Sequence, residues 1–489
     1  MSSVRQRVSS GIAGLDEVLM GGYVDSRGYL IRGGPGTGKT TVGMHFLVDG
    51  VKKGEKCLYI TLGESARDLT ENSEQIGLSV DGIEFLDLSP DSKFFSGSRT
   101  YDLFSAAEVE RDPMTKKIVE CVTSLRPRRV FLDSTSHLRY LSIDAHQFRK
   151  QLVSFIRFLL ELDCIVLFTS ESTTMMPDDD VMYLSDAVLS LTLEGSLRTL
   201  EICKFRGSDY RMGKHTLKLT AKGAVVFPRL VPSEHIMPFD PVHIHSGIEE
   251  IDRLLNGGLE KGTVTLFSGP AGVGKTTLAL QFAKEAAKNG TKVSMLSFEE
   301  SIDSIIHRAE SVQIPLKEMV KSRNLNIITI EPLLYSADQI SSIIREEVEV
   351  NGVQMLILDG ITGYRLSVEG DIQTQLRSVV KYLTNMGVTV IAINETENIT
   401  GDFRATEIGI SYMADNIVFI RYLELKGELR KAIGVLKKRL GDFERNIREF
   451  AITSSGIKLG QPLTNLRGIL QGVPEWKQEI SSHELIGNK

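Results

Sequence analysis

Cysteine is scarce in this chain of 489 residues, and the few cysteines present exclude two kinds of small-domain scaffold. The four are scattered over the first half of the chain with no C-x-x-C pair: Cys57, Cys121, Cys164 and Cys203. This distribution argues against a disulfide framework and against a zinc site. It favours a reducing compartment, so we expect the protein in the cytoplasm.

The sequence also lacks an uninterrupted apolar run that would cross a membrane, and its first residues lack the apolar core of a signal peptide. The most apolar stretch, residues 153–170, is interrupted by Arg157, Glu161 and Asp163. It therefore predicts a helix followed by a buried strand rather than a membrane span. We expect no association with a membrane.

An excess of basic residues is absent as well. Lysine and arginine together number 57 against 63 acidic residues, and the formal net charge of -6 gives no bulk attraction to nucleic acid or anionic lipid. Hydrophobic residues make up 42% and charged residues 25%, which is typical of a soluble globular protein. The length allows two or three domains.

The chain contains two copies of one pattern. The pattern begins at Gly11 with GIAGLDEVLMGGYVDSRGYLIRGGPGTGKTT and returns from Gly247 as GIEEIDRLLNGGLEKGTVTLFSGPAGVGKTT. The offset of 236 residues (247 − 11) holds as far as Glu64 and Glu300. A period of this length predicts a duplicated domain rather than a solenoid.

Each copy alternates short apolar runs with helical stretches. This alternation predicts parallel βαβ units, and hence an α/β fold with two tandem domains, each a mainly parallel sheet flanked by helices. The expected strands are residues 28–32, 56–61, 130–133 and 164–170 in the first copy, and 263–268, 292–298, 355–359 and 389–394 in the second.

Four prolines mark the junction of the copies and predict an extended linker: Pro228, Pro232, Pro238 and Pro241. We therefore expect four segments. They are a first ATPase domain at residues 1–230, a linker at 231–245, a second domain at 246–460, and a regulatory loop and tail at 461–489.

Both copies carry the sequence G-x-x-x-x-G-K-[ST] between an expected strand and an expected helix. The glycines let backbone N–H groups surround phosphates, the lysine reaches the β- and γ-phosphates, and the next hydroxyl ligates Mg²⁺. We therefore predict ATP and Mg²⁺ as ligands. The predicted ATP-binding residues of these loops are Gly33, Gly34, Pro35, Gly36, Thr37, Gly38, Lys39, Thr40 and Thr41, and Gly269, Pro270, Ala271, Gly272, Val273, Gly274, Lys275, Thr276 and Thr277.

An apolar strand that ends in an acid follows each P-loop. Asp133 closes VFLD and Asp359 closes MLILD, the place of the carboxylate that holds Mg²⁺. The distance from the P-loop lysine to this acid is longer in the first copy (133 − 39 = 94) than in the second (359 − 275 = 84), and we assign the extra length to SPDSKFFSGSRTYD. The predicted metal-site residues are Thr40, Asp133, Thr276, Glu299 and Asp359.

The copies differ where their second expected strand ends. The second copy has Glu299 and Glu300 there, at the edge where doubly wound sheets keep their active sites, and a carboxylate can polarise the attacking water or hydroxyl. The first copy has Gly63 followed by Glu64. We therefore expect the first domain to hydrolyse ATP slowly or only to bind it, unless Glu64 substitutes. The predicted catalytic residues are Glu299, Glu300 and Glu64.

The double P-loop, the GIxGLDE-type start and the F-E-E-S string together resemble the KaiC family of RecA-like ATPases and autokinases, over essentially the whole chain. The resemblance implies homohexamers, stacked as two rings, with ATP at the subunit interfaces. It implies that Glu299 is the general base of the second domain. It also implies that two K-x-R strings reach a neighbour's nucleotide: Lys204, Phe205 and Arg206, and Lys437, Lys438 and Arg439.

The resemblance further implies phosphate acceptors in FRATEIGISYMADN, where Thr406 and Ser411 match hydroxyl positions of the family. Clock proteins of the family have Thr after this Ser, whereas the present chain has Tyr412, so a two-site cycle on adjacent Ser and Thr cannot run unchanged. The segment from Thr464 resembles the family's regulatory loop and tail. A regulatory protein is therefore expected there or on the first-domain ring.

Three functions stay open at this point. The first is an ATPase and Ser/Thr autokinase in a signalling or clock role, and the second is a signalling ATPase of the same family without autokinase activity. The third is a RecA- or DnaB-like motor on DNA, which predicts basic Gly-rich loops. No strong loop of this kind is present, so nucleic acid is not favoured as a partner. The first two functions differ in whether Thr406 and Ser411 carry phosphate.

Overall fold

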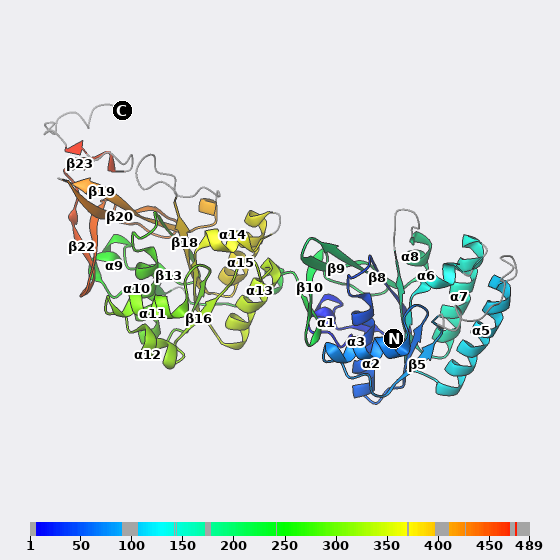
Figure 1. Ribbon diagram of the computed structural model, residues 1–489. Coiled ribbons are helices and arrows are strands. Elements are labelled where there is room, and N and C mark those ends of the chain that lie inside the picture. The colour runs from blue at the N-terminus through cyan, green and yellow to red at the C-terminus, as the bar shows by residue number, and fades with distance from the viewer. Residues whose placement is uncertain are drawn as a thin grey trace, which may run out of the picture. The chain divides into compact units, whose positions relative to one another are not determined.

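The computed structural model forms two compact units (Figure 1). Unit 1 is Met1–Arg229 and unit 2 is Leu230–Lys489. Thr406 and most of the stretch 89–102, to which we assign the extra length of the first copy, lie outside the described residues. The structure describes residues 6–89, 106–140, 142, 144–171, 178–240, 242–368, 371–396, 410–425, 427–469 and 475–476.

Unit 1 is built on a nine-stranded sheet and a two-stranded pair. The strands are β1 (Arg7–Val8), β2 (Tyr23–Val24), β3 (Gly28–Gly33), β4 (Cys57–Thr61), β5 (Ile83–Asp87), β6 (Arg129–Asp133), β7 (Ile165–Ser170), β8 (Ala187–Glu194), β9 (Leu197–Phe205), β10 (Lys214–Thr220) and β11 (Gly223–Phe227). The large sheet has the order β11-β10-β9-β8-β3-β7-β6-β4-β5. From β8 to β5 the strands are parallel, and β9, β10 and β11 extend the sheet in antiparallel fashion.

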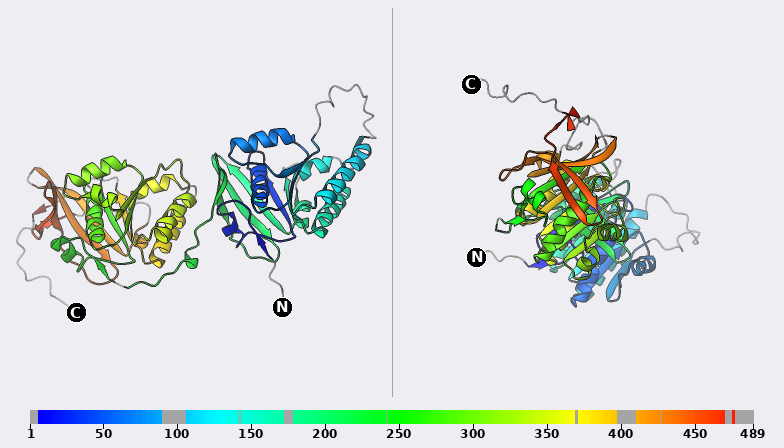
Figure 2. Two further views of the ribbon diagram at one scale, coloured as in Figure 1. Left: turned by 90° about the horizontal axis from the view of Figure 1, so that it is seen from below. Right: turned by 90° about the vertical axis from the view of Figure 1, so that its left-hand side faces the viewer.

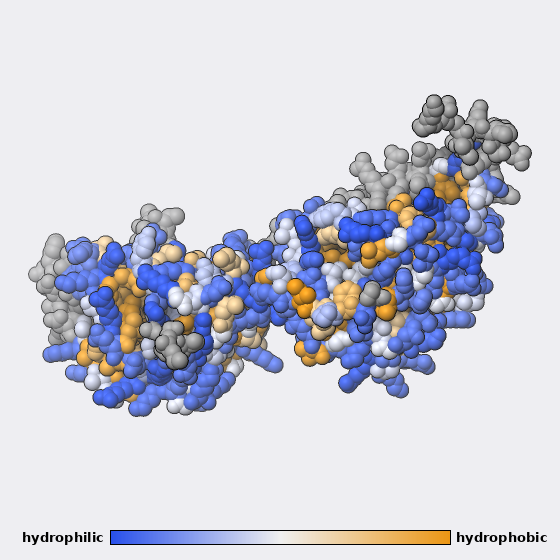
Figure 3. Space-filling model, turned by 180° about the vertical axis from the view of Figure 1, so that it is seen from behind, coloured by the Kyte–Doolittle hydropathy of each residue, from blue (hydrophilic) through white to orange (hydrophobic). Residues whose placement is uncertain are grey.

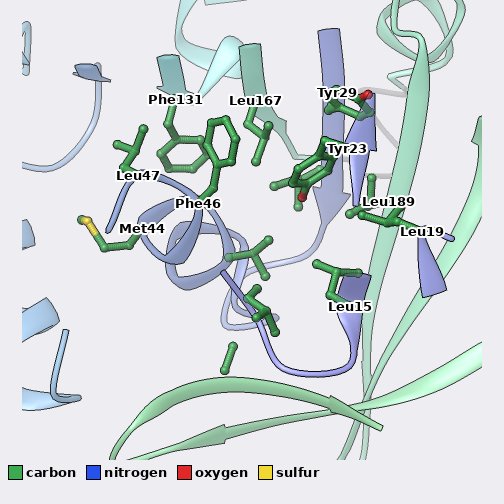
Figure 4. Close-up of a cluster of buried hydrophobic side chains, with 14 of the residues drawn as sticks. Leu15, Leu19, Tyr23, Tyr29, Met44, Phe46, Leu47, Phe131, Leu167 and Leu189 are labelled. Carbon is green, nitrogen blue, oxygen red and sulfur yellow. The ribbon is translucent and has the colours of Figure 1, made fainter. Parts of the chain in front are cut away.

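Helices cover both faces of this sheet (Figure 2). They are α1 (Leu15–Val18), α2 (Lys39–Lys52), α3 (Ala66–Gln75), α5 (Ala106–Leu125), α6 (Thr135–Tyr140), α7 (Ala145–Glu161) and α8 (Asp179–Leu184). Alternate residues of the buried strands therefore enter two separate cores. Phe131 and Leu167 pack with Phe46 of α2 on one face (Figure 4), and Val130 packs with Phe148 of α7 on the other. Such strands must be apolar on both sides, which explains their nearly continuous hydrophobic sequence.

Unit 2 repeats this architecture. Its strands are β12 (His243–Ile244), β13 (Leu259–Glu260), β14 (Val264–Gly269), β15 (Val293–Ser297), β16 (Leu325–Thr329), β17 (Met355–Asp359), β18 (Thr389–Glu395), β19 (Asn416–Leu425), β20 (Glu428–Lys438), β21 (Arg448–Thr453), β22 (Gly456–Pro462), β23 (Leu466–Arg467) and β24 (Glu475–Trp476). The nine-stranded sheet has the order β16-β15-β17-β18-β14-β19-β20-β21-β22, which matches unit 1 strand for strand. The predicted pair of α/β, RecA-like domains is confirmed.

The helices of unit 2 also lie on both faces of its sheet (Figure 2). The α-helices are α9 (Glu249–Leu254), α10 (Lys275–Lys288), α11 (Ile302–Glu310), α12 (Leu316–Lys321), α13 (Ala337–Arg345), α14 (Ile361–Leu366) and α15 (Ile372–Asn385). Short 3-10 or π turns are η1 (Pro232–Glu234), η2 (Glu346–Val350) and η3 (Ile410–Tyr412).

The Pro-rich linker packs against unit 2. Leu230 is buried in one of that unit's cores. The backbone N–H of Met237 donates to the carbonyl of Asn385 at 2.9 Å, and Asn385 Nδ2 donates to the carbonyl of Pro232 at 2.9 Å. The ring of His235 lies edge-on to Tyr382, 5.1 Å between centroids. The linker is therefore fastened to α15 between Pro232 and Met237.

Apolar surface gathers in strips between charged side chains on the face drawn in Figure 3. Among the described residues, no helix combines the length and the apolar character that a membrane span requires.

One buried charge ties α2 to the sheet of unit 1. Arg129, the first residue of β6, is fully buried and forms ion pairs with Asp49 at 3.0 Å and with Glu55. Its guanidinium also donates to the carbonyl of Phe46 at 2.7 Å and lies over the ring of that residue. Since the charge is desolvated, these partners must all be present for the arrangement to be stable.

We expect Arg129→Ala to destabilise unit 1 by about 3 kcal/mol, because it leaves a half-buried carboxylate pair without its countercharge. Hydrogen exchange in peptides that cover β6 measures the change within unit 1. Lys53→Ala is the matched control, since it removes the exposed Lys53–Asp49 pair and should cost under about 1 kcal/mol. Equal losses in the two variants would contradict the assigned role of Arg129.

Candidate functional site

Each P-loop joins a buried strand to a helix through a glycine turn, as the sequence predicts. In unit 1, β3 ends at Gly33 and α2 begins at Lys39. Gly36 and Gly38 have φ values of 70° and 101°, which glycine adopts without steric cost. A side chain on Gly34 or Gly36 would meet no atom within 4 Å. The turn therefore leaves open space at a helix start, which fits an anionic phosphate.

Unit 2 repeats this turn in detail. Gly272 and Gly274 have φ values of 71° and 110°. The residue between them, Val273, is buried in the hydrophobic core and so fixes the loop to it. In unit 1 the equivalent Thr37 is also buried, and its hydroxyl donates to the carbonyl of Gly34 at 2.9 Å.

The lysine of each P-loop lies over its own turn. Lys39 Nζ donates to the carbonyl oxygens of Gly33 and Gly34, at 2.8 and 2.9 Å. Lys275 makes the same two bonds in unit 2, at 2.8 and 2.7 Å. Burial lowers the pKa of both lysines, and nearby carboxylates oppose that shift. Each ammonium therefore lies at the mouth of its phosphate cradle.

The hydroxyl that follows each lysine bonds to the acid on a neighbouring strand. Thr40 Oγ1 donates to Asp133 Oδ2 at 2.7 Å, and Thr276 Oγ1 donates to Asp359 Oδ1 at 3.1 Å. In unit 1 the phenol of Tyr59 also donates to Asp133, at 3.0 Å. A hydroxyl and a carboxylate are the oxygen ligands that Mg²⁺ takes in nucleotide sites, so both pairs fit this ion.

The carboxyl group of Asp359 binds a proton more tightly than an exposed aspartate does. Burial raises its pKa from 3.8 to about 6, and the bond from Thr276 and the charge of Arg308 oppose part of that shift. Glu300 and Glu299 add to the rise through their negative charge. A cation at this position would remove the cost of ionising Asp359, which agrees with a metal-binding role.

In unit 2 the predicted acid pair lines a cavity of about 490 Å³ beside the P-loop. Burial raises the pKa of Glu299, the charge of Glu395 adds to the rise, and Lys275 opposes it. Glu300 instead forms an ion pair with Arg308 of α11. Of the two acids, Glu299 is the one whose surroundings favour the acceptance of a proton.

In unit 1 the backbone is the same but the first acid is missing. The N–H of Leu62 donates to the carbonyl of Asp133 at 2.9 Å, as the N–H of Phe298 does to Asp359 in unit 2. Gly63 therefore occupies the place of Glu299. Burial, with the charge of Asp133, raises the pKa of Glu64.

Two acids of the sites were missed by the sequence analysis. Glu395 is the last residue of β18 and lies beside Gly269 in the register of the sheet, and Glu171 directly follows β7 in unit 1. The charge of each opposes the lowering of the P-loop lysine's pKa. The sequence does contain a signal for them, since in both copies an acidic residue stands at the end of the fourth expected strand.

A cation that bonds to each P-loop was also missed. Arg198 Nε donates to the carbonyl of Gly36 at 3.2 Å, and Lys431 Nζ donates to the carbonyl of Gly272 at 3.1 Å. Arg198 lies on β9 and Lys431 on β20, the equivalent strand. Each lies six residues before the lysine of its K-x-R string, and this shared spacing could have revealed them in the sequence as equivalent residues.

The K-x-R strings lie on the same two strands. Lys204 Nζ donates to the carbonyls of Met182 and Ser185, at 2.8 and 2.6 Å, and Arg206 donates to the carbonyl of Tyr183 at 3.2 Å. The middle residue, Phe205, is buried against Tyr29. These side chains are thus held by unit 1 itself.

In unit 2, Lys437 Nζ donates to the carbonyls of Ser411 and Ala414, at 3.3 and 2.7 Å. Arg439 is exposed and pairs with Asp415 at 3.1 Å. The middle residue, Lys438, is buried and forms an ion pair with Glu260 at 2.8 Å. Its charge is therefore neutralised within unit 2. Among the described residues that line the cavity at Lys275 there is none from this string.

Comparison with known proteins finds one family over both units. A family model described as "ATPase: KaiC" matches the chain at residues 8–231 and again at 244–464. "Circadian clock protein KaiC3" of Synechocystis sp. is 26% identical over 99% of this chain and 97% of the relative. "Circadian clock oscillator protein KaiC" of Parasynechococcus marenigrum is 27% identical over 96% and 93%, and that of Parathermosynechococcus lividus 28% over 95% and 87%.

The raised pKa of Asp359 predicts a pH-dependent cost to the stability of unit 2. The folded form binds the proton more tightly than the unfolded chain, so stability is highest below pH 4 for this group and is lost as pH rises through about 6. We expect Asp359→Asn to stabilise nucleotide-free unit 2 at pH 8, by up to about 3 kcal/mol, and to have little effect near pH 4. Calorimetry of the full chain with EDTA measures the difference.

The control for this prediction is Asp442→Asn, which changes an exposed carboxylate of unit 2. It should leave the unfolding temperature unchanged at both pH values. A destabilising effect of Asp359→Asn at pH 8 would show that ionised Asp359 stabilises unit 2 and would contradict the prediction.

Proposed function

This chain belongs to the KaiC family of ATPases, and on that premise we propose that it hydrolyses ATP and phosphorylates itself on Ser411. In this proposal it is a non-specific Ser/Thr autokinase whose kinase site is in unit 2, and it acts as a cytoplasmic signalling or clock-type protein. Unit 1 binds ATP and turns it over more slowly. Mg²⁺ supplies the charge that neutralises the phosphates when it is bound at the Thr–Asp pairs.

The observation that carries the autokinase is a difference between two equivalent lysine contacts. Lys437 holds the carbonyls of Ser411 and Ala414, and Lys204 holds those of Met182 and Ser185. Ser411 therefore corresponds to Met182, which has no hydroxyl. The acceptor position beside a K-x-R string bears a hydroxyl in unit 2 and a thioether in unit 1, so phosphorylation is confined to unit 2. Thr406, outside the described residues, is proposed as a secondary acceptor.

The chemistry follows from the unit 2 site. Lys275 at the mouth of the turn binds the β- and γ-phosphates, and Thr276 with Asp359 orients the metal. Glu299 accepts the proton of the attacking water or of the Ser411 hydroxyl, since burial and the charge of Glu395 raise its pKa and so strengthen it as a base. Glu300, fixed by Arg308, holds the turn on which Glu299 stands.

We propose that ATP is bound between subunits of a homohexamer. Lys437 and Arg439 do not line the nucleotide cavity of their own unit, so the proposal assigns them to the nucleotide of a neighbouring subunit. Exposed apolar residues accompany each string, as a subunit interface requires: Tyr183 and Met212 in unit 1, and Tyr412 and Leu440 in unit 2. A regulatory protein at the C-terminal tail or on the unit 1 ring remains part of the proposal.

We expect phosphate on Ser411 after incubation of the full chain with Mg-ATP, and its loss in Glu299→Gln. Phosphopeptide mass spectrometry measures both. Since one general base contributes about 10² to 10⁴ in rate, the variant should lose at least about 99% of phosphoryl transfer. Glu64→Gln is the control and should leave phosphorylation unchanged. ATP consumption without phosphate on any residue would favour a signalling ATPase of the same family that lacks the autokinase.

We expect Mg-ATP to shift the chain from the 54.2 kDa monomer to about six times that mass, because a ligand that bridges subunits binds the assembled form more tightly. Light scattering at micromolar concentration measures the mass. Arg439→Ala should raise the ATP concentration at half-assembly by about tenfold, since it removes one interfacial charge. Arg430→Ala, which changes an exposed arginine of β20, is the control. A monomer at saturating Mg-ATP would overturn the assembly.

A further inference from the structure

Three positions differ together between the two nucleotide sites. The first follows the second strand of the parallel sheet, the second follows the acid that ends β6 or β17, and the third is the third residue of the next helix, α6 or α14. At the first position unit 1 has glycine and unit 2 has a side chain. At the second and third positions unit 1 has a side chain and unit 2 has glycine. The pairs are Gly63 and Glu299, Ser134 and Gly360, and His137 and Gly363.

In unit 1 the imidazole of His137 fills the space beside Gly63. A Cβ placed on Gly63 would lie 2.9 Å from His137 Cε1 and 3.2 Å from Nε2. Nδ1 on the other side of the ring lies 3.1 Å from Ser134 Oγ, and the backbone N–H of His137 donates to the carbonyl of Ser134 at 3.2 Å. The ring is thus fixed at one nitrogen, and its other nitrogen is directed to the position of the missing acid.

In unit 2 the carboxylate takes this space and two glycines provide room for it. A Cβ on Gly360 would lie 3.3 Å from Glu299 Oε1. A Cβ on Gly363 would lie 2.3 Å from Phe298 Cβ, so no side chain fits there without displacement of Phe298. The two units therefore fill one place with two different proton-accepting groups, a carboxylate in unit 2 and an imidazole in unit 1.

We propose that His137 accepts the proton of the attacking water in the unit 1 site, the task that Glu299 has in unit 2. The inference rests on the proposed ATPase function. The role requires the tautomer in which Nδ1–H donates to Ser134 Oγ, so that Nε2 carries the lone pair. Nε2 takes a proton from water as the water oxygen bonds to the γ-phosphorus of ATP. The bond from phosphorus to the β,γ-bridging oxygen breaks, its electron pair leaves with ADP, and the imidazolium returns the proton to solvent.

The other charged groups at this edge of unit 1 have different surroundings. Lys39 is bonded to its own turn, and Asp133 accepts hydrogen bonds from Thr40 and Tyr59. Glu64 occupies the position of Glu300, since the hydroxyls of Thr61 and Ser297 donate to their backbone carbonyls in the same way. Glu171 follows β7 and acts on Lys39. None of these four side chains stands at the place of Glu299.

The test measures ATP hydrolysis by unit 1 in the full chain, with unit 2 silenced by Glu299→Gln and Glu300→Gln. We expect His137→Ala in this background to lower kcat about 100-fold and to change KM for ATP less than about twofold. His146→Ala, an exposed histidine of α7, is the matched control and should change neither value. Binding of two molecules of a fluorescent ATP analogue per chain in each variant verifies that unit 1 is folded.

A reciprocal exchange separates a chemical role from a structural one. Gly63 has no left-handed φ, so Gly63→Glu is opposed only by the ring of His137. We expect the Gly63→Glu/His137→Ala pair to regain most of the kcat that His137→Ala loses, because it reproduces the arrangement of unit 2. An unchanged kcat in His137→Ala, or an equal loss in His137→Ala and in the pair, would overturn the proposal.

The same experiment separates this inference from the proposed function. If the Glu299→Gln/Glu300→Gln chain binds ATP but hydrolyses none, His137 is not a base and the inference fails, while the unit 2 activity stands. If the unaltered chain hydrolyses no ATP, the proposed function itself fails.

Discussion

Both nucleotide sites depend on the parallel pairing of strands within each sheet. In unit 2, β14 pairs with β18 and β15 pairs with β17, so that Gly269 lies beside Glu395 and Ser297 beside Asp359. Backbone hydrogen bonds fix this register, and each strand delivers its next residue to the same edge. The helix that follows the P-loop places its hydroxyl against the acid of a strand that lies about 80 residues further along the chain, at 3.1 Å from Asp359 Oδ1. Residues that are far apart in sequence thus form one site.

The residues that the sequence revealed are those that belong to a local pattern. Lys39, Thr40 and Asp133 each stand at a fixed offset from a glycine turn or a strand end, and the structure brings them together as expected. Arg198 and Lys431 were missed because their contacts with the P-loops span 162 and 159 residues, across an antiparallel extension whose length no local pattern encodes. The period-2 alternation of a strand does explain why the middle residue of each K-x-R string turns inward, although the string alone gives no sign of it.

The two units show how a duplicated domain diverges without a change of fold. The strand order is the same in both sheets, and the P-loop turns have nearly equal backbone angles. The differences that change the nucleotide sites lie at strand ends and in the helices that directly follow them. Of the three exchanged positions, His137 contacts both Gly63 and Ser134, so a change at one position alters the room available at its neighbour. Such positions must change together, and the same holds in the core: Arg129 and its ion-pair partner Glu55 are matched in unit 2 by Met355 and Thr291, neither of which is charged.

The linker gives the two halves different boundaries in sequence and in space. The repeat recognised in the sequence resumes at Gly247, but the folded body of unit 2 begins with Leu230, and α15 holds the segment between them. A fragment of unit 2 that began at Gly247 would lose the seventeen residues before it (247 − 230), among them Leu230 of the core and the residues that bond to α15. An excised second half that keeps its packing therefore has to start at Leu230, well ahead of the point at which the repeat resumes.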